Sequence, residues 1–137
     1  MKKILFTILF TCILFSCQEK DLIKEKAISK VKSQMKNPDS FEFVDYKVFK
    51  TQTFAEAKKM LQLTKKLILI TTGSEKDNYQ KEYDFINSGT NENETAIYSV
   101  YLTAKGTNSF GAIIQSKYVV KILNNDSKDV VYINEKK

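Results

Sequence analysis

Few residues in this 137-residue chain can carry out chemistry. The chain contains no His, and all 22 of its basic residues are Lys, so His-based triads, imidazole metal sites and His acid–base catalysis are excluded. A carboxylate-based hydrolase would have to use acids such as Glu82, Asp84 and Glu92, whose spacing indicates no cleft. The polar loops 91–94 and 124–129 lack the ligand spacing of an EF-hand. We therefore predict no catalytic residue, no metal site and no cofactor.

Cys17 is the residue with the clearest chemical role, because it follows an export signal. Met1-Lys2-Lys3 is a short basic start, and an uncharged, largely apolar run covers residues 4–15. The run ends in Leu14-Phe15-Ser16-Cys17, which resembles the cleavage motif of bacterial lipoproteins, although Phe15 is bulkier than usual at its position. The resemblance implies transfer of diacylglycerol to the Cys17 thiol, cleavage before Cys17 and acylation of the new amine. An ordinary secretory signal or an uncleaved anchor is the alternative interpretation.

The lipoprotein interpretation divides the chain into a signal peptide (1–16), a lipidated N-terminus and tether (17–20) and a single α+β domain (21–137). Membrane lipid is then the first partner, because two or three acyl chains anchor a protein stably. Gln18 follows the lipidated Cys, which by analogy favours the outer membrane. The stretch Gln18-Glu19-Lys20-Asp21 is similar to the charged segment of surface-exposed lipoproteins of Bacteroidota-type bacteria. Whether the domain faces the periplasm or the medium stays open.

Hydrophobic periodicity predicts the elements of the domain. A helix covers residues 21–35, and the polar and apolar stripes of residues 54–72 favour one long helix, with Thr53 and Glu56 as a capping box. The alternative is a helix followed by a strand over 67–72, a stretch with high β-propensity. The remaining elements are a strand over 41–50, a helix from Ser74 to Ile86, and strands over 95–104, 110–123 and 130–133. The predicted fold is therefore α+β: an N-terminal helix, a strand, a helical hairpin and a C-terminal antiparallel three-stranded meander.

Two short motifs, residues 36–43 and 105–112, resemble paired turns of small exported bacterial proteins, one similar to "PDS-x-x-F" and the other to "NSFGA". The resemblance implies a shared architecture without an assigned activity. We interpret both motifs primarily as determinants of the fold, and we expect the ring of Phe110 to be buried. If Phe110 were instead exposed, the turn formed by Asn108, Ser109 and Phe110 would become the candidate binding site.

The sequence favours a non-enzymatic binding or interaction domain at the cell envelope, with an envelope protein as partner. The alternatives are an inhibitor or immunity-type lipoprotein that inserts a loop into its target, and the carboxylate-based hydrolase. We expect no nucleic-acid partner, because Arg is absent and the lysines are interleaved with acids. Two weaker hypotheses are an aromatic groove formed by Tyr79, Tyr83, Tyr98 and Tyr101, and attraction to anionic lipid headgroups by Lys24, Lys30, Lys32, Lys58 and Lys65.

Overall fold

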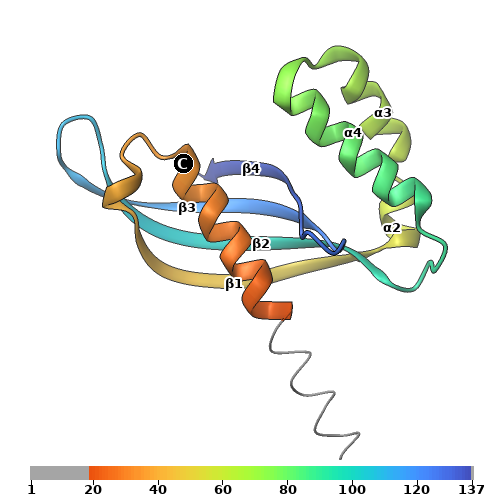
Figure 1. Cartoon of the computed structure of the whole chain (residues 1–137), viewed down its shortest axis with the longest axis horizontal. Coiled ribbons are helices and arrows are strands. Elements are labelled where there is room, and N and C mark those ends of the chain that lie inside the picture. The colour runs from red at the N-terminus through yellow and green to blue at the C-terminus, as the bar shows by residue number, and fades with distance from the viewer. Residues whose placement is uncertain (1–18, 137) are drawn as a thin grey trace, which may run out of the picture.

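The computed structural model describes residues 19–136 (Figure 1). An N-terminal helix occupies residues 19–34 of this part and is followed by a short 3₁₀ turn, η1 (Pro38–Ser40). The other elements are β1 (Glu42–Thr53), α2 (Phe54–Lys58), α3 (Leu61–Ile70), α4 (Gly73–Ser88), β2 (Thr95–Thr107), β3 (Ile113–Leu123) and β4 (Val130–Lys136). The predicted α+β class is confirmed.

The strands form one antiparallel sheet in the order β1-β2-β3-β4. The predicted meander is present in β2, β3 and β4, and β1 pairs with β2 to add a fourth strand at its edge. Side chains alternate between the two faces of a strand, so Val100 and Leu102 of β2 point to one face while Tyr101 points to the other. One of these faces packs against the N-terminal helix, and the opposite face does not.

The N-terminal helix lies across one face of the sheet (Figure 1). Its apolar residues recur at helical spacing, and they are almost completely buried. The cluster that they form with the strands contains Ile23, Ala27, Val31, Val100, Leu102, Val120 and Ile122. Burial of these side chains is the main force that holds the helix on the sheet, because each large aliphatic side chain contributes about 1.5–3 kcal/mol when it leaves water.

The N-terminal helix runs in the same direction as β2. Glu19 at its start contacts Tyr98, and Met35 just after its end packs against Gly106. Sixteen helical residues rise by about 24 Å, and the eight residue-to-residue steps from Tyr98 to Gly106 rise by about 26 Å, so the two elements match in length. A Cβ atom at Gly106 would overlap the terminal methyl of Met35, so the end of the Met35 side chain packs directly on the backbone of β2.

Residues 54–58 and 61–70 are helical, so the alternative with a strand over 67–72 is wrong. The prediction of one continuous helix is also wrong in detail, because the helix breaks at residues 59–60 and ends at Ile70. The break lets α2 turn Phe54 and Ala57 toward the sheet while α3 packs along α4. The capping box at the start of α2 is confirmed, with Thr53 N–H donating to Glu56 Oε2 at 2.9 Å and Glu56 N–H donating to Thr53 Oγ1 at 3.3 Å.

A second core cluster joins the helical hairpin to the end of the sheet where β2 begins. It contains Phe54, Ala57, Ile86, Ala96, Ile97, Leu123 and Val131. Phe54 also contacts Gly89, where a Cβ atom would overlap its ring. The two clusters therefore fix the N-terminal helix and the helical hairpin separately onto one sheet.

Candidate binding turn and its supporting contacts

The two turn motifs singled out in the sequence meet in space. The backbone N–H of Thr107 donates to Ser40 Oγ at 2.9 Å, across 67 residues of sequence. Asn37 Nδ2 donates to Thr107 Oγ1 at 2.9 Å, and Lys36 Nζ donates to Ser109 Oγ at 3.4 Å. The end of the N-terminal helix and η1 therefore support the base of the β2–β3 hairpin.

The candidate turn itself is organised by the side chain of Asn108. Its Oδ1 atom accepts hydrogen bonds from the backbone N–H groups of Phe110 and Ala112, at 2.9 and 3.0 Å. The backbone adds a bond from Asn108 N–H to the carbonyl of Ala112 at 3.0 Å. Gly111 has a φ of 79°, a left-handed conformation that glycine adopts without steric cost. These contacts give the turn one defined conformation.

The expected burial of Phe110 is wrong, because its side chain is 92% exposed. The predicted strand over residues 110–123 starts only at Ile113, and the left-handed Gly111 separates Phe110 from it. The β2–β3 hairpin also extends past the end of the N-terminal helix, so no helix of residues 19–136 lies over its tip (Figure 1). Ile113 is 74% exposed beside it, and the tip is therefore an apolar projection.

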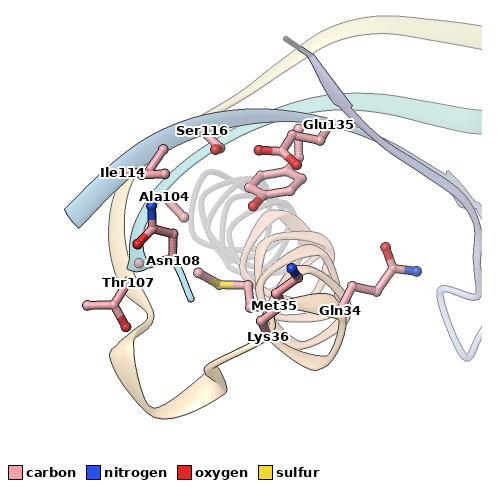
Figure 2. Close-up of a pocket in the computed structure, with 11 residues that line it drawn as sticks. Gln34, Met35, Lys36, Ala104, Thr107, Asn108, Ile114, Ser116 and Glu135 are labelled. Atoms are coloured by element: carbon pink, nitrogen blue, oxygen red, sulfur yellow. The ribbon is translucent and has the colours of Figure 1, made fainter. Parts of the chain in front are cut away.

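A cleft of about 300 Å³ lies beside this turn, between the end of the N-terminal helix and the sheet (Figure 2). Met35, Ile114 and Tyr118 provide apolar walls, and Lys36, Asn108 and Glu135 provide polar groups. Burial, with the carboxylate of Glu135 nearby, raises the pKa of the Tyr118 hydroxyl. This mixture of groups suits a protein side chain or a short peptide segment, which needs apolar contact and a few hydrogen bonds.

A polar cluster holds the start of the N-terminal helix to the β3–β4 turn. Lys128 is only 8% exposed, and its Nζ donates to Glu19 Oε1 at 3.0 Å and to Asn124 Oδ1. The Tyr98 hydroxyl donates to the same Glu19 oxygen at 3.0 Å. The bond from Lys128 lowers the pKa of Glu19, whereas burial and the Glu19 carboxylate raise the pKa of Tyr98.

This cluster moves the start of the folded domain from residue 21, as the sequence suggested, to Glu19. Residues 17–20 were expected to form a tether, but Glu19 and Lys20 belong to the helix, and Glu19 is held by the domain. Sequence reasoning also missed Lys128, because a lysine in a loop rich in Asn and Asp looks solvent-exposed. Lys128 is buried because its ammonium group pairs with the carboxylate of Glu19, which lies 109 residues away in the sequence.

The acids considered for hydrolysis have separate partners. Glu82 is buried on α4 and accepts from Lys121 Nζ at 3.0 Å. Asp84 accepts from Gln80 at 2.8 Å, and Glu92 lies 4.0 Å from Lys58 Nζ. Each of the three acids therefore contacts a different residue of the protein.

The four tyrosines of the suggested groove lie on different surfaces. Tyr98 belongs to the cluster under the N-terminal helix, and Tyr101 points to the opposite face, where it stacks on Phe49. Tyr79 and Tyr83 are on α4, where the Tyr79 hydroxyl donates to Glu75 at 3.4 Å. Two of the lysines considered for lipid headgroups have partners within the protein: Lys24 lies over the Phe43 ring and Lys58 lies near Glu92.

Cys17 and the predicted signal peptide lie outside the described residues. Within residues 19–136, no group of three His, Cys, Asp or Glu side chains is placed to hold a metal ion. No helix in that part of the chain is long and apolar enough to cross a membrane. Comparison of the chain with protein-family models, with curated proteins and with solved structures found no match.

Proposed function

We propose that this chain is a lipid-anchored, non-enzymatic binding domain of the bacterial cell envelope, which contacts a partner protein through Asn108, Ser109 and Phe110. The observation that carries the proposal is the exposed ring of Phe110 on a turn with a fixed conformation. Leaving such a ring in water forgoes about 1.5–3 kcal/mol of burial free energy. A partner that covers the ring recovers that free energy, and exposed aromatic side chains on ordered turns are typical binding hot spots.

The anchor rests on the sequence pattern that ends at Cys17. Only Gln18 separates Cys17 from Glu19, which the domain holds through Lys128. Two residues of chain reach at most about 7 Å, so an acylated Cys17 keeps this end of the domain at the membrane surface. The N-terminal helix leads from there toward the candidate turn, about 24 Å farther on. With this helix directed away from the membrane, the turn lies on the aqueous side, where a protein partner has access to it.

Removal of the thiol tests the anchor. The Cys17→Ser variant should no longer incorporate a labelled fatty acid, and it should keep residues 1–16, because cleavage before position 17 depends on the lipidated Cys. Ser16→Ala is the matched control, because a small residue before Cys17 is retained and lipidation should continue. If Cys17→Ser incorporates the labelled fatty acid as the wild type does, the chain is not anchored through this residue.

Truncation of Phe110 tests the contact. After reversible chemical crosslinking in intact cells, the wild-type chain should co-purify with one envelope protein in stoichiometric amount, and Phe110→Ala should lose most of it. Leu69→Ala is the control, because Leu69 is also an exposed apolar side chain, at 78%, but lies on α3. Equal recovery from Phe110→Ala and Leu69→Ala would contradict a role for the turn.

An inhibitor or immunity-type lipoprotein is the second candidate, and the projection of the β2–β3 hairpin beyond the helix supports it (Figure 1). A narrow hairpin with an apolar tip suits insertion into a cleft of a target protein. The two candidates differ in their effect on the partner: an inhibitor abolishes the activity of its partner at one-to-one stoichiometry, and an interaction domain leaves that activity unchanged.

A further inference from the structure

The face of the sheet opposite the N-terminal helix carries a group of lysines, which we call the lysine cluster: Lys47, Lys117 and Lys136 around Tyr101. Lys47 lies directly across from Tyr101 in the β1–β2 register. Lys117 and Lys136 are cross-strand partners in the β3–β4 register. The helical hairpin covers only one end of this face, where Glu82 of α4 meets Lys121. All three lysines of the cluster are exposed.

Tyr101 holds two of the lysine side chains in place. Its ring stacks on Phe49, with centroids 4.0 Å apart. Lys117 Nζ lies 4.3 Å and Lys136 Nζ lies 4.9 Å from the centroid of the same Tyr101 ring. Lys136 Nζ also donates to the Tyr101 hydroxyl oxygen at 3.2 Å. Attraction between an ammonium group and an aromatic ring therefore restrains both side chains before any ligand arrives.

Other lysines of this face are neutralised by acids. Lys105 lies 3.5 Å from Glu42, and Lys121 lies 3.0 Å from Glu82. Within residues 19–136, neither Lys117 nor Lys136 has a carboxylate oxygen within 4.0 Å. Asp45 shares their cross-strand row but lies two strands from Lys117, about 10 Å away. Two like charges are thus brought to one ring without a protein anion between them.

We propose that the lysine cluster binds the carboxylate or phosphate groups of a negatively charged sugar chain. An anion between Lys117 and Lys136 removes their mutual repulsion and accepts two charge-assisted hydrogen bonds. The Tyr101 hydroxyl accepts from Lys136, so its own proton is available to the same anion. Lysine suits this role because it binds an anion as a point charge and needs no fixed bidentate geometry.

Exposed aromatic rings on the same face favour a sugar chain over a small ion. Phe49 on β1 is 39% exposed and Tyr132 on β4 is 41% exposed. These rings lie on the two edge strands, so an extended chain that crosses the sheet can pack sugar rings on them while its anionic groups meet the lysine cluster. This surface is separate from the Asn108–Phe110 turn, and the inference does not depend on the function proposed for that turn.

Binding of the full-length chain to polygalacturonate, a carboxylate-bearing sugar polymer, tests the inference. The chain is purified in a non-ionic detergent, and its dissociation constant is measured for the wild type and for Lys117→Ala/Lys136→Ala. The matched control is Lys26→Ala/Lys32→Ala, which removes the same charge from exposed positions on the N-terminal helix. We expect a several-fold weaker affinity for the sheet variant and little change for the control. Equal losses in the two variants, or no loss in the sheet variant, would overturn the inference.

Competition separates a sugar chain from a simple anion. Oligogalacturonate should displace the bound polymer at a lower concentration than inorganic phosphate of the same total charge, and Phe49→Ala/Tyr132→Ala should reduce this advantage. If inorganic phosphate competes as well as the oligosaccharide does, the cluster is a general anion site and the assignment to a sugar chain is wrong.

Discussion

Ser40 accepts a hydrogen bond from the backbone N–H of Thr107 at 2.9 Å, and its own hydroxyl donates to the carbonyl of Asn37 at 2.8 Å. One hydroxyl thus connects the turn after the N-terminal helix with the β2–β3 hairpin. The conformation of the candidate binding turn depends on this connection, because the described part of the chain places no helix beneath the hairpin tip.

Ser40→Ala should lower the free energy of unfolding by about 1–2 kcal/mol, because the N–H of Thr107 loses its acceptor in a partly buried position. The measurement is the midpoint of urea unfolding. Ser33→Ala is the control: Ser33 is exposed and bonds only to the carbonyl of Lys30, so its loss should change stability by less than about 0.5 kcal/mol. Equal midpoints for the two variants would show that Ser40 does not support the hairpin.

Two half-buried tyrosines, Tyr46 and Tyr98, should respond differently to removal of the hydroxyl. The hydroxyl of Tyr46 is buried without a hydrogen-bond partner within the described part of the chain, so Tyr46→Phe should leave stability unchanged or raise it. Tyr98→Phe removes a bond to the charged Glu19 and should cost about 1–2 kcal/mol. Thermal unfolding of the two variants gives the comparison, and a larger loss for Tyr46→Phe would contradict the assigned contacts.

The Glu19 cluster should make stability depend on pH at both ends of the range. The folded-state pKa of Glu19 lies below its ordinary value of 4.5, so its stabilising contribution is present above about pH 4.5 and is lost as the pH falls through the folded-state pKa. The pKa of Tyr98 is raised in the folded state, so its contribution is present below about pH 10 and is lost at higher pH.

Glu19→Gln tests both the acid limb and the alkaline limb of the curve of stability against pH. The variant should show a flatter loss of stability below pH 4.5 than the wild type in urea unfolding followed across pH. It should also flatten the loss above pH 10, because the Glu19 carboxylate contributes to the raised pKa of Tyr98. Glu25→Gln, an exposed acid on the same helix, is the control and should leave both limbs as they are in the wild type. Identical acid limbs for Glu19→Gln and the wild type would contradict the ion pair with Lys128.

The sequence predicted those elements whose signals are local. The N-terminal helix follows from the spacing of Ile23, Ala27 and Val31, and the start of α2 follows from the capping box at Thr53. The helical period across residues 54–70 outweighed the β-propensity of its last residues. The break at residues 59–60 could not be predicted, because it depends on which neighbours α2 and α3 each pack against.

The candidate site was also only partly predictable, because part of it depends on residues that are distant in the sequence. The motif at residues 105–112 predicted a turn, and the turn is indeed built from local hydrogen bonds to the Asn108 side chain. Exposure of Phe110 depends on where the N-terminal helix ends relative to the hairpin tip, which no local pattern records. Burial of Lys128 likewise depends on Glu19, a residue from the other end of the domain.

Phe110→Ala should leave the melting temperature unchanged, because an exposed ring contributes little to stability, within about 0.5 kcal/mol. Leu102→Ala is the contrasting control, because Leu102 is fully buried and its truncation should cost about 2–5 kcal/mol. A fall in melting temperature for Phe110→Ala that approaches that of Leu102→Ala would mean that the ring is buried.

Site-specific photo-crosslinking in intact cells tests the central claim most directly. A benzophenone-bearing phenylalanine analogue replaces Phe110 in one variant and Ile70, an exposed apolar residue of α3, in another. Under illumination, the variant labelled at position 110 should form one covalent product with an envelope protein, and the variant labelled at position 70 should not form that product. A product that forms from position 70 and not from position 110, or that forms equally from both, would contradict the assignment of the Asn108–Phe110 turn as the binding site.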